Sequence, residues 1–180
     1  RQTSSLWFIV LLINISIQFV GCGTPEAVRP ALIPMPQEIS WSEGIFRMSG
    51  NEHKVVKRMV DSLPGVAIHA DEAYSLMVSP DSVVLQAMTP TGLFRGEQTL
   101  RQLTYVHKGR EVVAGCTITD FPAFRIRGFM QDVGRNYMSL PLLKEQIDVL
   151  AAYKFNVFHF HVTDNPGWRQ IGRASCRERV

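Results

Sequence analysis

The 180-residue chain has few cysteines, no long run of one charge and no apolar segment that fits a membrane-spanning helix. Its cysteines, Cys22, Cys116 and Cys176, are too few and too widely spaced for a disulfide framework or a metal site. The formal net charge of +3 comes largely from residues 171–180, which carry three arginines and one glutamate. We interpret this tail, which resembles a translated sequencing adapter, as an artefact. The near-neutral remainder argues against nucleic acid as a partner.

The start of the chain is typical of an exported protein. Leu6–Ile13 is an unbroken apolar run, Asn14–Val20 is mixed, and the small residues 21–23 follow, which predicts a secretory signal peptide over residues 1–21. The residues up to Cys22 resemble a bacterial lipobox. We therefore expect a lipid anchor on Cys22, a tether over residues 22–33 and a location in the bacterial cell envelope, in the periplasm or at the outer-membrane surface. An ordinary signal peptide with an incidental cysteine is the alternative.

Residues 34–122 mix short strands with two predicted helices, which favours a small α+β domain. Val55, Val56, Met59, Val60 and Leu63 recur at helical spacing before Pro64-Gly65 and predict the first helix; the second is predicted from Thr91 to about Tyr105. The predicted strands are Glu38–Trp41, Ile45–Met48, Tyr74–Val78, Val83–Met88 and Val112–Thr119, with a hairpin at residues 79–82.

Two carboxylates and one cysteine of this domain are candidates for a functional role. Asp71 and Glu72 are adjacent carboxylates, but they lie between a helix end and a strand, and we interpret them as part of a solvated turn. Cys116 lies alone in a strand-like run, where we expect a small buried hydrophobic side chain.

The pattern changes after residues 120–122. Ile126–Val133 predicts a strand, Ser139 caps a helix with Pro141 in its first turn, and Phe155–Thr163 predicts a second strand. A strand, a helix and a strand form a βαβ unit with parallel strands. We therefore expect a second domain over residues 123–170. Two parallel strands cannot bury both faces of a sheet, so the chain is expected to be a fragment.

Polar residues follow both predicted strands of this unit. Asp132 lies at the end of the first and Arg135 just after it, and Asp164 and Trp168 come after the second. Ligands bind at this edge of parallel α/β folds. An arginine can donate to two sugar hydroxyls, and an indole can cover a pyranose face. The alternative for Arg135 and Asp164 is a structural ion pair.

His159 and His161 share one face of the second strand. A His-x-His pattern at a strand end can hold zinc, so a zinc-dependent amidohydrolase-type barrel is another alternative. Histidines hydrogen-bonded within a barrel are the more common explanation of this pattern.

Three motifs resemble family-20 glycoside hydrolases, the β-N-acetylhexosaminidases. Leu93–Leu103 is similar to the helix that closes their N-terminal domain, Arg127–Tyr137 to their first barrel strand, and Tyr153–Arg169 to their second. The resemblance covers about residues 34–170. It implies a (β/α)₈ barrel, here truncated after its first βαβ unit, that removes terminal N-acetylhexosamine from glycans. It implies no metal or organic cofactor.

The resemblance also implies roles for particular residues. Arg135 matches an arginine that binds the 3- and 4-hydroxyls of the sugar, and Asp164 matches an aspartate that orients a histidine; Asp132, His161 and Trp168 are possible supporting residues. Arg127 is expected to be structural. Gly134, Asn136 and Asn165 depart from the family pattern, which usually has Ser, His and Asp there.

In this family the substrate's acetamido oxygen attacks the anomeric carbon with retention. The assisting Asp-Glu pair belongs to a His-x-Gly-Gly-Asp-Glu stretch without a match in the chain, so the fragment itself is expected to be inactive. A non-catalytic, surface glycan-binding lipoprotein is the remaining alternative.

Overall fold

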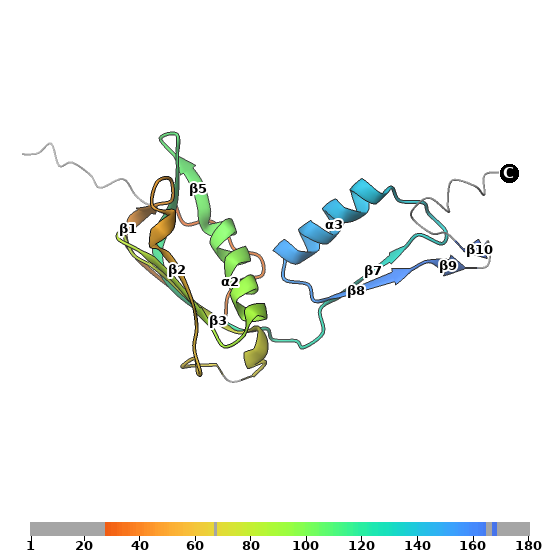
Figure 1. Ribbon diagram of the computed structural model, residues 1–180, viewed down its shortest axis with the longest axis horizontal. Coiled ribbons are helices and arrows are strands. Elements are labelled where there is room, and N and C mark those ends of the chain that lie inside the picture. Colours follow the sequence, from red (N-terminus) through yellow and green to blue (C-terminus); the bar gives the residue numbers. More distant parts are fainter. Residues whose placement is uncertain (1–27, 67, 165–166, 169–180) are drawn as a thin grey trace, which may run out of the picture.

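A computed structural model describes residues 28–66 and 68–164, together with the backbone of residues 167–168. The predicted signal peptide, Cys22 and the tail at residues 171–180 lie outside the described residues. The described chain forms two units, a sheet with one helix and a parallel strand pair with another helix, joined by a connecting segment (Figure 1). No helix in this part of the chain is long and apolar enough to cross a membrane.

The first unit is built on a six-stranded mixed sheet. The strands are β1 (Glu38–Arg47), β2 (Val55–Met59), β3 (Tyr74–Val78), β4 (Val83–Ala87), β5 (Thr104–His107) and β6 (Arg110–Asp120). Their order is β1-β6-β3-β4-β2, and β5 pairs with the start of β6. Only the pairing of β2 with β4 is parallel within this sheet. The predicted hairpin is confirmed, because β3 and β4 pair and Ser79 N donates to Ser82 O at 2.9 Å.

Helix α2 (Pro90–Leu103) covers one face of this sheet (Figure 1). Thr89 caps its start, since Thr89 Oγ1 accepts a hydrogen bond from Gly92 N at 3.1 Å. The helix ends two residues before the predicted end, because Tyr105 belongs to β5, which pairs with β6. Large side chains of the sheet and the helix form the core, among them Phe46, Tyr74, Leu76, Leu85, Leu103 and Ile118.

Cys116 fits the prediction made for it. It is a free cysteine, fully buried in β6, and burial raises the pKa of its thiol to about 11. The thiol therefore stays protonated at neutral pH and packs as a small hydrophobic group.

The predicted helix over residues 55–63 is wrong. Val55–Met59 is strand β2, which follows a short 3₁₀ turn, η1 (Glu52–Lys54), and pairs in parallel with Val83–Ala87. Its residues are half-buried or exposed, so an apolar helix face has little core to cover here. The β-branched Val55 and Val56 suit a strand, and the edge of β4 offers backbone partners that the chain pattern does not reveal.

The two short strands predicted at residues 38–48 form the single strand β1. Both halves pair with β6, and the register shifts between Trp41 and Ile45. The predicted turn is therefore a bulge, in which Gly44 adopts a φ of 92°. The bulge fits closely over Gly115, where an added Cβ would lie 2.7 Å from Ser42 Oγ.

The second unit confirms the predicted βαβ arrangement. Strand β7 (Gly128–Asp132), helix α3 (Leu140–Ala152) and strand β8 (Val157–His161) follow one another, and β7 pairs with β8 in parallel. Ser139 is the N-cap of α3 and a proline lies in the first turn, but the Ser139 side chain makes no capping hydrogen bond. Two further short strands, β9 (Thr163–Asp164) and β10 (Gly167–Trp168), pair antiparallel.

The prediction of a solvated turn at Asp71 and Glu72 is wrong for Glu72. The turn exists as the 3₁₀ helix η2 (Ala70–Glu72), but Glu72 is only 8% exposed. Its carboxylate forms ion pairs with Arg95 in α2 and with Arg127, which directly precedes β7. Arg127 is thus structural, as the family resemblance implies.

Candidate functional site

The candidate site lies where β7 and β8 end, and we call it the rim, formed by Asp132, Arg135, His161 and Asp164. The backbone fixes how the two strands end. Asp132 pairs with His161 in the ladder, and Val133 N and Gly134 N both donate to His161 O, at 3.0 and 3.3 Å. The turn after β7 is therefore held against the end of β8, and the predicted residues are brought to one edge.

Arg135 is the centre of the rim. Its backbone N donates to Asp132 Oδ1 at 3.1 Å, and its Nε donates to Asp132 Oδ2. The same Nε lies 3.0 Å from Asp164 Oδ2. The ion pair between Arg135 and Asp164 thus exists, as the structural interpretation required. The Arg135 side chain is nevertheless 61% exposed in this part of the protein, so its two carboxylate partners do not enclose it.

Gly134 allows the close approach of the two strand ends. An added Cβ there would lie 3.1 Å from Thr163 C and 3.2 Å from Asp164 N, which is tighter than ordinary van der Waals contact. The serine that is usual in the family would press on the backbone that carries Asp164. The close packing against Thr163 and Asp164 therefore explains why glycine fits at position 134 in this chain.

Asp132 and Arg135 stabilise each other's charged forms. The backbone N–H of Arg135 lowers the pKa of Asp132 below its ordinary value, and the Arg135 side chain adds to this effect. The hydrogen bond to Asp132 raises the pKa of Arg135, with a smaller effect from Asp164. Asp132 and Arg135 are therefore both charged at neutral pH.

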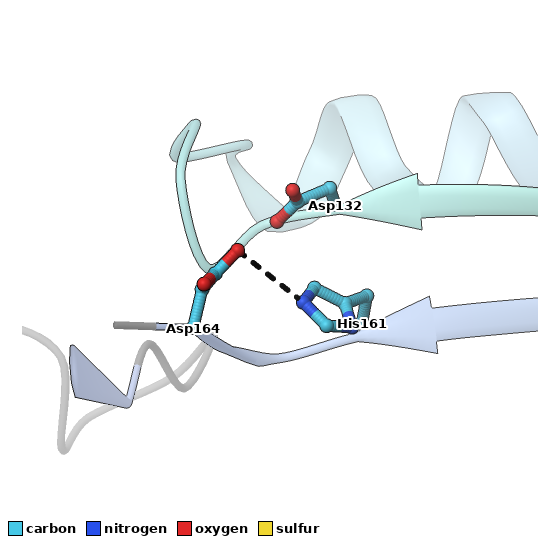
Figure 2. A group of neighbouring side chains, drawn as sticks. All are labelled: Asp132, His161 and Asp164. Carbon is cyan, nitrogen blue, oxygen red and sulfur yellow. Dashed lines mark ion pairs between the residues drawn. The ribbon is translucent and has the colours of Figure 1, made fainter. Parts of the chain in front are cut away.

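His161 joins the rim from the end of β8. Figure 2 shows its ring directed toward Asp164, with His161 Nε2 3.8 Å from Asp164 Oδ2. Asp132, His161 and Asp164 each offer one ligand atom, and these atoms lie within 4.8 Å of one another. By proximity these three residues could hold a divalent cation. Arg135 already supplies a positive charge to both carboxylates, so the charge balance favours a polar organic ligand over a metal ion.

Some of the other predicted residues are described by the structure, and others are not. His159 and His161 do share a strand face, with ring centroids 6.3 Å apart, but the carboxylates gather around His161. The backbone of Trp168 pairs with Thr163, which keeps it close to Asp164 in the fold. Its side chain, like Asn165, lies outside the described residues. Asp132 is the direct partner of Arg135. The two residues are three positions apart at the end of a strand, and this spacing is the signal in the sequence that they can pair.

A hollow of about 250 Å³ lies away from the rim, at the boundary of the two units. Charged residues of both units line it, including Glu72, Arg95, Asp120, Arg127 and Lys154. Each of these is paired with another residue of the same set. The hollow therefore offers a ligand no unpaired charge among the described residues, and the rim remains the better candidate.

Two family models match the chain along most of its described length. Residues 51–121 match "Glycosyl hydrolase family 20, domain 2", and residues 124–173 match "Glycosyl hydrolase family 20, catalytic domain". The two matches follow one another in the chain and correspond to the sheet unit and the βαβ unit. The chain belongs to glycosyl hydrolase family 20.

Curated members of family 20 are similar over much of this chain. A beta-N-acetylhexosaminidase of Cellulomonas fimi is 34% identical over 162 residues, which cover 89% of this chain and 31% of that protein. A beta-hexosaminidase of Vibrio vulnificus is 31% identical and covers 85% of this chain and 22% of its own length. The chain thus spans less than a third of the curated family-20 relatives that it matches here.

Solved family-20 structures agree with this assignment. An exo beta-N-acetylglucosaminidase from Vibrio harveyi, in complex with N-acetylglucosamine, aligns with a TM-score of 0.67 and 28% identity, over 77% of this chain and 26% of that one. An N-acetyl-beta-hexosaminidase of Streptomyces plicatus aligns with a TM-score of 0.66, over 79% of this chain and 37% of its own. The described fold is thus that of one part of a family-20 protein.

Proposed function

We propose that the whole protein is a β-N-acetylhexosaminidase that removes terminal N-acetylhexosamine from glycans. The observation that carries this proposal is the rim. Arg135 and Asp164 come from the ends of neighbouring parallel strands, form an ion pair and leave the guanidinium exposed, within a segment that matches the family-20 catalytic domain. The names of the relatives support the same activity.

In this proposal Arg135 binds neighbouring hydroxyls of the terminal sugar. A guanidinium offers several N–H donors in a fixed plane, which suits two adjacent hydroxyl acceptors. Asp132 and Asp164 hold the guanidinium in place and stabilise its charge. The proposed chemistry is retaining hydrolysis assisted by the substrate's own acetamido group, within a (β/α)₈ barrel that β7, α3 and β8 begin.

The test uses the full-length gene product and a pair of aryl glycosides. We expect hydrolysis of an aryl N-acetyl-β-glucosaminide but not of the matched aryl β-glucoside, because the second lacks the acetamido group that performs the attack. A chelator should leave the rate unchanged. Binding of N-acetylglucosamine without hydrolysis would identify a glycan-binding protein instead, and loss of activity with the chelator would favour a zinc hydrolase.

The same assay tests the role of Arg135. Arg135→Ala should lower kcat/KM roughly a hundredfold or more, since a charged hydrogen-bond donor to the substrate is lost. Arg125→Ala is the matched control, because Arg125 is an exposed arginine of the connecting segment. Equal, small effects of the two substitutions would reduce Arg135 to a structural residue.

A further inference from the structure

Charged side chains are buried between the two units. Glu72 and Arg95 come from the first unit, and their side chains are 10% and 8% exposed. Lys154, between α3 and β8, and Asp120, at the end of β6, are buried to a similar extent. Removing such charges from water costs several kcal/mol per ion unless each is paired and hydrogen-bonded. The contacts of these side chains show which parts of the two units they hold together.

Glu72 binds the two residues that directly precede the parallel strands. Its Oε2 accepts hydrogen bonds from Arg127 Nη2 at 2.5 Å and from Arg95 Nε at 2.7 Å. Its Oε1 accepts from Asn156 Nδ2 at 2.8 Å. Arg127 precedes the first residue of β7, and Asn156 precedes the first residue of β8. One carboxylate of the first unit thus holds the starts of both strands.

Arg127 and Asn156 are also partners of each other. Arg127 N donates to Asn156 Oδ1 at 2.9 Å, and Asn156 N donates to Arg127 O at 3.0 Å. The ladder then continues with Gly128 opposite Val157. A slip of one residue would bring Phe155 or Val157 to the place of Asn156, and neither has a side-chain amide that could donate to Glu72. The contact with Glu72 therefore distinguishes the native register from its neighbours.

A second set of contacts holds the loop between α3 and β8. Lys154 Nζ donates to Tyr74 Oη and to Asp120 Oδ2, both at 2.8 Å. Arg95 Nη1 donates to the carbonyl of Phe155 at 3.1 Å, and Gln102 Nε2 donates to that of Ala152 at 3.0 Å. The start of β8 is thus tied to α2 and to the sheet at several points. The first unit therefore fixes the residue at which β8 begins to pair with β7.

We infer that the first unit sets the register of the parallel strands through a clamp formed by Glu72, Arg95, Arg127 and Asn156. The clamp acts at one end of β7 and β8, and the rim lies at the other. A slip of one residue would turn every side chain of a strand to the opposite face. The clamp therefore positions Arg135 and Asp164 relative to each other. Only this consequence for the sugar site rests on the proposed function.

Amide hydrogen exchange in the full-length protein tests the clamp without measuring activity. Glu72→Gln keeps the shape of the side chain but leaves Arg95 and Arg127 without their buried anion. We expect the amides of β7 and β8 to exchange at least about tenfold faster, while those of β4 and β6 change little, because local opening becomes easier only where the clamp acts. Glu97→Gln is the control; it removes a carboxylate of α2 that pairs with the exposed Lys57.

Two results would overturn the inference: unchanged exchange in β7 and β8, or the same acceleration in every strand. If Glu72→Gln does not fold, Asn156→Ala provides a second test. It leaves the buried ion pairs intact and removes the side-chain amide that binds Glu72 and Arg127. The same pattern of faster exchange is expected there. A full-length protein that hydrolyses no aryl N-acetylhexosaminide would refute the proposed function, whereas the exchange pattern alone decides on the clamp.

Discussion

Lys154 and Lys57 each pair with one carboxylate, but their surroundings differ. Lys154 Nζ lies 2.8 Å from Asp120 Oδ2 with 7% of its side chain exposed, whereas Lys57 Nζ lies 2.8 Å from Glu97 Oε1 with 49% exposed. Burial lowers the pKa of Lys154, and the charge of Asp120 opposes this shift. The energy of a pair depends more on the water that it has lost than on its length.

Replacing each lysine by methionine should separate the two cases. Lys154→Met leaves the carboxylate of Asp120 buried without a cation, so we expect the free energy of unfolding to fall by about 3 to 5 kcal/mol. Lys57→Met should change it by less than about 1 kcal/mol, because the pair is exposed. Urea titration measures both values. If Lys154→Met lowers the free energy of unfolding as little as Lys57→Met does, Asp120 finds another partner or becomes hydrated when Lys154 is gone.

Local pattern was a good guide to the rim and a poor one to the buried charges. Asp132 and Arg135 are three residues apart at a strand end, so their proximity is a local property that the sequence displays. Glu72 meets Arg127 and Asn156 across 55 and 84 residues. No local pattern distinguishes such a residue from one in a solvated turn. The assignment of Arg127 as structural came from the family resemblance, not from spacing.

At the scale of elements, α2 depends on two glycines that let it lie close to the rest of the first unit. An added Cβ at Gly92 would lie 2.3 Å from the carbonyl oxygen of Ala73, and one at Gly96 would lie 2.3 Å from Leu85 Cδ1. The neighbours of Gly96 are side-chain atoms of Leu85 and Tyr74, whereas the Ala73 carbonyl is backbone next to β3. Gly92 is therefore the position at which the approach of helix and sheet is most tightly fixed.

Gly92→Ala should destabilise the protein although alanine favours a helix. Overpacking of this kind costs about 1 to 3 kcal/mol, which exceeds the gain of up to about 1 kcal/mol in helix propensity. Arg101→Ala, at an exposed position of the same helix, should stay within about 0.5 kcal/mol of the parent protein. Thermal unfolding of the two variants measures the difference. A gain in stability for Gly92→Ala would show that α2 can shift away from Ala73 at no cost.

Elements with a clear apolar period and a local boundary signal were predictable. The hairpin of β3 and β4 has turn residues between two strand-like runs, and α3 follows its N-cap, Ser139, with a proline in its first turn. β2 was not predictable, because its apolar residues fit a helical period and its strand partner, β4, lies about 28 residues further along the chain. Tertiary pairing decided the conformation of this segment.

At the scale of the whole molecule, the clamp links stability to acid pH. Burial alone would raise the pKa of Glu72, but hydrogen bonds from Arg127, Asn156 and Arg95 outweigh it and lower the pKa below its ordinary value of 4.5. In the unfolded chain these bonds are absent. Glu72 therefore stabilises the folded state above pH 4.5, and this contribution is lost as the pH falls through the lower, folded-state pKa.

Comparison of the parent protein with Glu72→Gln isolates this contribution. Glu52 and Asp132 also have lowered pKa values, but both remain in the variant, so their effects cancel in the difference. We expect the difference in unfolding free energy to be largest near neutral pH and to shrink steadily below about pH 4.5, because protonation of Glu72 in the parent removes the same charge that the substitution removes. Urea titrations of both proteins at pH 7 and at lower pH values measure it. A difference that stays constant with pH would mean that Glu72 holds Arg127 and Asn156 through shape and neutral hydrogen bonds, and that its charge contributes nothing to joining the two units.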